Sequence, residues 1–186
     1  MRLFIALPTP GSVAESILLD TAALRGKYPD LKWVRQDALH LTLTFLGEVE
    51  KEKLEAIYRA MDAAGRMQEP FQLRYAGLET FPHRGMPRVL FLPVTGGGRE
   101  CSLLNRVLVS RIGEAIEVDR RKFTPHLTLA RVKNSRNWPD VRSEGLDLTA
   151  AFEARKIVLF RSHLKPDGAE YEELYSAQLG GNGDRV

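Results

Sequence analysis

Residues 39–45 read LHLTLTF and residues 126–129 read HLTL, so the motif His-Leu-Thr-Leu occurs twice, at His40 and at His126. In the first copy polar and apolar residues alternate, which is the pattern of a β-strand with one buried face. The leucines of such a strand face a core, and the histidine and the threonine project together from the other side. The eight motif residues are His40, Leu41, Thr42, Leu43, His126, Leu127, Thr128 and Leu129.

The repeat extends upstream of the motif and organises the chain. Residues 2–8 read RLFIALP and residues 88–93 read RVLFLP, and the leading arginines, like the histidines, are 86 residues apart. A repeat of this length indicates two similar units. Each unit runs from a short apolar strand through a helical stretch into His-Leu-Thr-Leu, with helices expected from about residue 12 and between residues 98 and 119.

Further elements complete a fold prediction. A helix is expected over 51–64, strands over 71–78, 155–161 and 172–179, and a polar connection over 133–147. The sequence therefore predicts an α+β protein with a bilobal, duplicated fold, in which two antiparallel sheets face a central cleft and the helices lie outside. We expect residues 1–180 to form this single bilobal domain and residues 181–186 to form a flexible tail.

Composition limits the class of protein. The chain has 186 residues, 44% of them hydrophobic, and a formal net charge of only +3, so charge permits binding to an anion without requiring it. We expect a cytoplasmic protein without a membrane span, because uninterrupted apolar runs of about 18–20 residues are lacking. The single cysteine, Cys101, cannot form an internal disulfide. Self-contained lobes favour a monomer.

Two His-x-Thr strands that face one cleft would have a definite chemistry. Imidazole gives or takes a proton near neutral pH, and a threonine hydroxyl donates to an anionic oxygen. One neutral and one protonated histidine, His126 and His40 in either order, would suit in-line displacement at phosphorus. A single copy of the motif is more often structural, so this interpretation depends on the repeat. We read His83 and His163 as non-catalytic because neither has such a partner.

Other chemistries have weaker support in the sequence. A zinc site would need a third protein ligand near the histidines, and none accompanies both copies, so we expect no metal and no cofactor. A nucleophilic serine would need a glycine elbow. Gly96, Gly97 and Gly98 lie between a strand and a helix, but they lack the Lys-Ser/Thr of a phosphate-binding loop and are interpreted as a connection.

The residues resemble a known family. The chain is similar to the 2H phosphoesterase superfamily, specifically the bacterial and archaeal RNA 2′,3′-cyclic phosphodiesterases first described as 2′-5′ RNA ligases. The similarity is carried by residues 2–6, 39–49, 81–82, 87–90 and 123–131. It implies a bilobal α+β fold, and metal-independent hydrolysis of an RNA 2′,3′-cyclic phosphate to a 2′-phosphate, with reverse 2′-5′ ligation also associated with the family.

The resemblance also implies roles for individual residues. His126 would accept a proton from the attacking water and His40 would donate one to the leaving oxygen. Thr42 and Thr128 would hold phosphate oxygens, with Arg131 as a further phosphate ligand. Position 131 has the wrong strand parity relative to His126, so Arg131 reaches the cleft only if the strand ends, twists or bulges first. Arg88 is a candidate phosphate ligand of the same kind as Arg131. Looser candidates for contacts with an RNA backbone are Arg35, Arg84, Arg120 and Arg121.

Three functions therefore remain open. The first is a phosphodiesterase acting on RNA ends. The second is the same chemistry on a small cyclic nucleotide or a 2′-5′ oligonucleotide. The third is a module that binds RNA ends in the cleft without turning them over.

Overall fold

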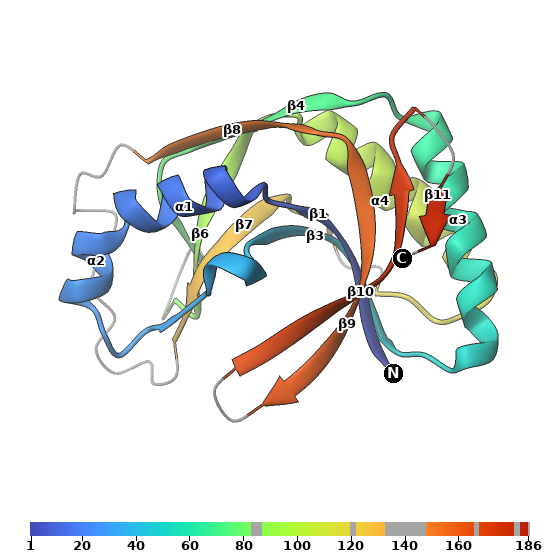
Figure 1. Ribbon diagram of the computed structural model, residues 1–186, viewed down its shortest axis with the longest axis horizontal. Helices are drawn as coiled ribbons and strands as arrows, with labels where there is room; N and C mark the ends of the chain where they lie inside the picture. Colours follow the sequence, from blue (N-terminus) through green and yellow to red (C-terminus); the bar gives the residue numbers. More distant parts are fainter. Residues whose placement is uncertain (83–86, 120–121, 133–147, 166–167, 181–182, 186) are drawn as a thin grey trace.

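A computed structural model describes residues 1–82, 87–119, 122–132, 148–165, 168–180 and 183–185, which form two antiparallel sheets flanked by helices (Figure 1). The first sheet has the strand order β11-β10-β9-β1-β3. Its strands are β1 (Arg2–Pro8), β3 (His40–Glu48), β9 (Lys156–Lys165), β10 (Gly168–Gln178) and β11 (Gly183–Arg185).

The second sheet has the order β2-β7-β6-β4-β8, and β5 pairs with β6 beside this path. Its strands are β2 (Lys32–Trp33), β4 (Phe71–Ala76), β5 (Glu79–Phe81), β6 (Val89–Gly96), β7 (His126–Arg131) and β8 (Thr149–Ala154). The run β3-β1-β9-β10 in one sheet corresponds to β7-β6-β4-β8 in the other. The predicted α+β fold with two antiparallel sheets is therefore confirmed.

The helices do not stay with the sheet of their own repeat. They are α1 (Gly11–Asp20), α2 (Ala22–Lys27), α3 (Leu54–Met67) and α4 (Gly98–Ile112), with short 3₁₀ turns η1 (Gln36–Ala38) and η2 (Lys51–Lys53). Helix α1, from the first repeat, contacts β8 of the second sheet, whereas α4, from the second repeat, contacts β3. Figure 1 shows α1 and α2 on the side of β6 and β7, and α3 and α4 at the opposite end. Each lobe is thus completed by the other half of the chain.

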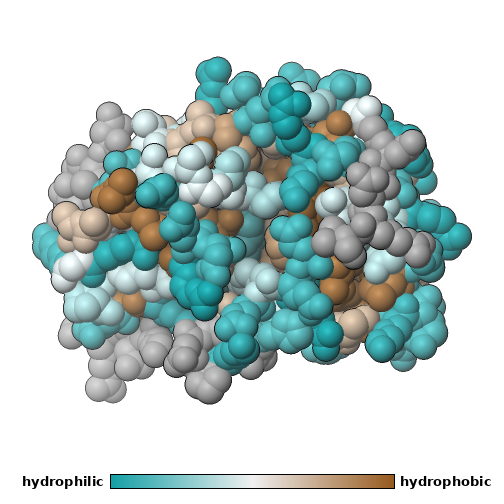
Figure 2. All heavy atoms as spheres, in the orientation of Figure 1, coloured by the Kyte–Doolittle hydropathy of each residue, from teal (hydrophilic) through white to brown (hydrophobic). Residues whose placement is uncertain are grey.

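The strand sequences explain the layers. Residues 3–7 of β1 are all buried, which is the pattern of a central strand covered on both faces. The buried residues of α3, at positions 57, 60, 61, 64 and 65, follow helical spacing and form one apolar face. Hydrophilic residues cover most of the molecular face in Figure 2, with hydrophobic atoms visible in separate small areas.

The structure adds to the sequence predictions at a few places. The expected strands over 71–78, 155–161 and 172–179 correspond to β4, β9 and β10. The sequence does not predict strand β8, because its residues TAAFEA lack a run of β-branched or aromatic side chains. Within the expected flexible tail, Gly183–Arg185 pair with Tyr175–Ala177 of β10. The expected connection over 133–147 lies outside the described residues.

Candidate active site

The two motif strands have the same burial pattern, residue for residue. In β3 and in β7 the histidine and the threonine are partly exposed, and the leucines are buried. Leu41, Leu43, Leu127 and Leu129 all belong to the main hydrophobic core, each at most 1% exposed. Both strands also have the same register, since His40 is opposite Pro8 in β1 and His126 is opposite Pro93 in β6.

A β-bulge interrupts the alternation at the same point in each strand. The pairing of β3 with β1 skips Leu43, and the pairing of β7 with β6 skips Leu129. Such a bulge gives one strand an extra residue and shifts the side chains that follow it to the other face. As a result Thr44 and Ala130 are buried next to the buried leucines, and the following residues, Phe45 and Arg131, are exposed.

The bulge determines on which side of β7 the Arg131 side chain lies. A regular strand would have turned this side chain away from the face of Thr128, but the extra residue brings it back to the side of the cleft. Arg131 and Thr128 both line the cavity described below. Phe45 occupies the matching position in the first lobe and lines the same cavity, with 50% of its surface exposed.

Backbone carbonyls hold both imidazoles in one orientation. Nδ1 of His40 is 2.8 Å from the carbonyl oxygen of Ala38, and Nδ1 of His126 is 2.7 Å from that of Thr124. A carbonyl only accepts, so each Nδ1 carries a hydrogen and donates it. In the neutral ring Nε2 is then the unprotonated nitrogen. In His40 it lies 3.0 Å from Oγ1 of Thr42, whose hydroxyl donates to it.

Aromatic rings surround each histidine. The ring of His40 lies 4.9 Å from that of Phe4, 5.2 Å from that of Tyr171 and 6.2 Å from that of Phe160, measured between centroids. These rings form a small apolar cluster on the first sheet, separate from the main core. Among the described residues, Phe81 and Phe91 lie beside His126, with ring centroids at 5.1 Å and 5.2 Å.

These apolar surroundings make both histidines poor bases in the free protein. The pKa of His40 is lowered from 6.5 to about 4, chiefly by burial, with smaller contributions from Arg131 and His126 in the same direction and the hydrogen bond to Ala38 acting against them. Burial and then Arg131 also lower the pKa of His126, against its bond to Thr124. Both rings are therefore neutral at pH 7 when no anion is bound.

A cavity of about 580 Å³ joins the two lobes at the motif strands. It is lined by Arg2, Leu3, Phe4, Val34, Ala38, His40, Thr42, Phe45, Gly47, Thr128, Arg131, Ser162, Ala169 and Tyr171. The charged side chains among these described residues are both arginines, so the cavity favours an anion. His126 is outside this lining, but it projects from the same face of β7 as Thr128.

Several cavity residues could not be found from the motif. Tyr171 comes from β10, far along the chain, and burial raises the pKa of its hydroxyl while Arg131 and Arg2 oppose this rise. The hydroxyl therefore stays protonated and can donate a hydrogen bond. In the sequence Arg2 stands out only as part of the repeat. Phe45 is visible in the stretch 39–45, but strict alternation assigns it to the buried face.

The other sequence candidates lie elsewhere. Arg35 is paired with the carboxylate of Asp37, and Arg88 is exposed but is not a cavity residue. Nε2 of His163 is 2.7 Å from Glu172, outside the cavity. His83, Arg84, Arg120 and Arg121 lie outside the described residues.

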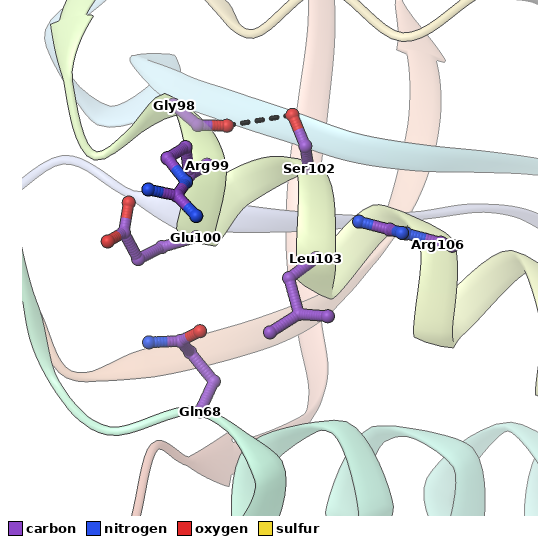
Figure 3. Close-up of a pocket in the computed structure, with 7 residues that line it drawn as sticks. All are labelled: Gln68, Gly98, Arg99, Glu100, Ser102, Leu103 and Arg106. Carbon is purple, nitrogen blue, oxygen red and sulfur yellow. Dashed lines mark hydrogen bonds between the residues drawn. The ribbon is translucent and has the colours of Figure 1, made fainter.

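A second hollow, of about 690 Å³, lies at the start of α4 and shares no residue with the cleft (Figure 3). Leu103 points into it from α4, toward Gln68. It lies beside the glycine run that precedes this helix. Gly97 has a φ of +84°, and a Cβ there would be 2.7 Å from the carbonyl oxygen of Gln72. The positive φ and the lack of room for a Cβ both explain why residue 97 is a glycine in this tight connection.

Metal ligation and membrane insertion have no support in the part of the chain that the structure describes. Within the described ranges, no group of three or more His, Cys, Asp or Glu side chains is arranged to hold a metal ion. No helix among the same residues has both the length and the apolar character needed to cross a bilayer.

The fold and the cleft together define a class: a duplicated bilobal protein in which each lobe contributes one His-x-Thr strand to a shared cleft. The sequence model of the 2'-5' RNA ligase superfamily matches residues 10–166. The chain belongs to this superfamily.

Relatives and solved structures agree with this assignment. The RNA 2',3'-cyclic phosphodiesterase of Archaeoglobus fulgidus is 33% identical over 94% of this chain and 98% of its own length. That of Geobacillus stearothermophilus is longer, and the chain spans 58% of it at 29% identity. The crystal structure of TT0787 of Thermus thermophilus has a TM-score of 0.79 at 31% identity, covering 97% of this chain and 99% of that one. E. coli LigT complexed with 3'-AMP has a TM-score of 0.76 at 27% identity, covering 96% and 97%.

Proposed function

We propose that this protein hydrolyses RNA 2′,3′-cyclic phosphate ends to 2′-phosphomonoesters. The observation that carries the proposal is the matched pair of His-x-Thr strands, with His40, Thr42, Thr128 and Arg131 lining one cavity. The names of its relatives support the same reaction.

The two histidines would divide the proton transfers. A water oxygen attacks phosphorus while Nε2 of His126 accepts the proton that the water loses. The bond from phosphorus to the ribose 3′-oxygen breaks, and Nε2 of His40 donates the proton that this oxygen needs. Both rings keep Nδ1 bonded to a carbonyl throughout, so only Nε2 changes its protonation. Exchange with solvent then restores the starting state.

As the general acid, His40 must carry a proton on Nε2, but in the free protein at pH 7 its ring is neutral. A phosphodiester carries one negative charge, and an opposite charge nearby favours the protonated imidazole. Binding of the cyclic phosphate would therefore raise the pKa of His40 from its low value in the apolar pocket. The substrate itself would prepare the general acid, so that protonation and binding are coupled.

The remaining cavity residues would hold the phosphate and the nucleobase of the RNA end. The hydroxyls of Thr42 and Thr128 and the guanidinium of Arg131 would bond to the non-bridging oxygens, on which charge increases in the transition state. Phe45 offers an exposed ring on which a nucleobase can stack without sequence preference. The hydroxyl of Tyr171 is a further donor at the first-sheet side.

The same site would support 2′-5′ ligation. If the 5′-hydroxyl of a second RNA takes the place of water, its oxygen bonds to phosphorus, the 3′-oxygen leaves, and a 2′-5′ phosphodiester forms. The proton transfers at His126 and His40 are unchanged. Further proposals, carried over from the sequence, are a single bilobal domain over residues 1–180, a monomeric state and a cytoplasmic location.

An oligonucleotide that ends in a 2′,3′-cyclic phosphate tests the main proposal. We expect a 2′-phosphate product in the presence and in the absence of EDTA, and loss of turnover in His126→Ala. A small cyclic nucleotide and a 2′-5′ oligonucleotide, assayed in parallel, separate the related substrates by kcat/KM. Binding of the RNA end without turnover would refute the enzymatic proposal and favour a module that only binds RNA ends.

A further inference from the structure

The bulge in β3 leaves a backbone group that a side chain from another element satisfies. Leu43 has no opposite residue in the pairing of β3 with β1. Its carbonyl oxygen accepts a hydrogen bond of 2.8 Å from Nδ2 of Asn105, a residue of α4 that is 62 positions away in the chain. Because a carbonyl only accepts, the amide nitrogen and not the amide oxygen must face it.

The second lobe satisfies the equivalent carbonyl differently. The backbone N–H of Val34 donates to the carbonyl oxygen of Leu129 over 2.8 Å. Val34 directly follows β2, whose Trp33 is opposite Ala130 of β7, so this bond extends the ladder of a neighbouring strand. In the first sheet β3 is the last strand in the order of described strands. At this open edge, the amide of Asn105 makes the bond that β2 supplies to β7.

The carbonyl of Leu43 belongs to the backbone that directly follows Thr42 and leads to Phe45. The bulge at this point decides that both of these side chains face the cavity. A bulge leaves a backbone group without a partner in the strand ladder, and a carbonyl beside a buried residue costs free energy unless another group bonds to it. We propose that Asn105 is a positioning residue that fixes this bulge, and through it the Thr42 hydroxyl and the Phe45 ring. Its importance for turnover rests on the function proposed above.

Substitutions at Asn105 test this inference. Asn105→Leu keeps the size of the side chain and removes the donor, and Asn105→Asp keeps the shape and replaces the donor with an acceptor. Asn105→Gln keeps a donor. We expect kcat on the cyclic phosphate to fall about 10-fold to 100-fold in the first two variants, the scale of a slightly misplaced catalytic group. The Gln variant should retain more activity than the Asp variant.

A double-mutant cycle separates positioning from general destabilisation. If Asn105 acts through Thr42 and Phe45, Asn105→Leu should lower kcat less than about twofold further in a Thr42→Val/Phe45→Ala background, but by its full factor in a Thr128→Val background. Ser102→Ala is the matched control on α4, because its hydroxyl bonds to Gly98 of the same helix, and it should leave kcat unchanged. Equal losses in these two backgrounds, or a lower Tm with unchanged kcat, would overturn the inference.

Amide hydrogen exchange supplies a measurement independent of activity. In Asn105→Leu we expect faster exchange in residues 40–48 of β3 and unchanged exchange in residues 126–131 of β7. If the wild-type protein does not hydrolyse the cyclic phosphate, the proposed function fails while exchange still decides whether Asn105 fixes the bulge. Unchanged exchange in β3 would refute the positioning role whatever the activity.

Discussion

Acid should destabilise this protein through His40. In the folded state the ring lies among Phe4, Phe160 and Tyr171, and burial holds its pKa at about 4, against 6.5 in an unfolded chain. Between these two values the unfolded chain binds more protons than the native protein. The contribution of His40 to stability is therefore fully present above pH 6.5 and is lost as the pH falls toward 4.

The size of the effect follows from the two pKa values. One pKa unit corresponds to about 1.4 kcal/mol, so the contribution of His40 to the free energy of unfolding decreases by about 2 kcal/mol between pH 7 and pH 5, and by about 3 kcal/mol at pH 4. His126 has a lowered pKa as well and adds a loss of the same sign. A comparison with a variant that lacks only the His40 imidazole removes the contribution of His126.

Urea unfolding of wild type and of His40→Gln at several pH values measures this effect. Glutamine does not titrate, so its other consequences for stability are independent of pH in this range. The difference in unfolding free energy between the two proteins should shift by about 2 kcal/mol between pH 7 and pH 5, with the wild type losing more. A difference that stays constant from pH 7 to pH 4 would refute the reasoning, because His40 would then titrate normally in the fold.

Three further predictions concern activity. If a bound phosphate raises both imidazole pKa values, as proposed above, the pH optimum of kcat should lie above that of kcat/KM, and coincident optima would count against coupled protonation. His40→Ala and His126→Ala should each lower kcat by about 10² to 10⁴, measured with the cyclic-phosphate oligonucleotide, and near-wild-type turnover would exclude the assigned roles. Thr42→Val and Thr128→Val should leave Tm nearly unchanged while slowing hydrolysis at least ~10-fold, because each removes one donor to the developing charge, and unfolding of both variants would indicate packing instead.

The sequence by itself determined the duplication and the two His-x-Thr strands. The repeat of His-Leu-Thr-Leu and its period-two pattern identified two strands, their buried leucines and their paired polar side chains. These properties depend on local geometry, since alternate residues of a strand face opposite sides. For the same reason the helices of both repeats and most of the strands could be predicted, with uncertain ends.

Tertiary structure alone decided which other residues join the motif. Arg131 and Phe45 face the cavity because a bulge shifts the register by one residue, and alternation in the sequence does not reveal a bulge. Tyr171 reaches His40 through the pairing of β9 with β10 and of β9 with β1. Asn105 meets β3 because α4 packs on the sheet of the other repeat. Each of these contacts joins residues far apart in the chain, so it depends on strand register and helix packing, which form only when the whole core assembles.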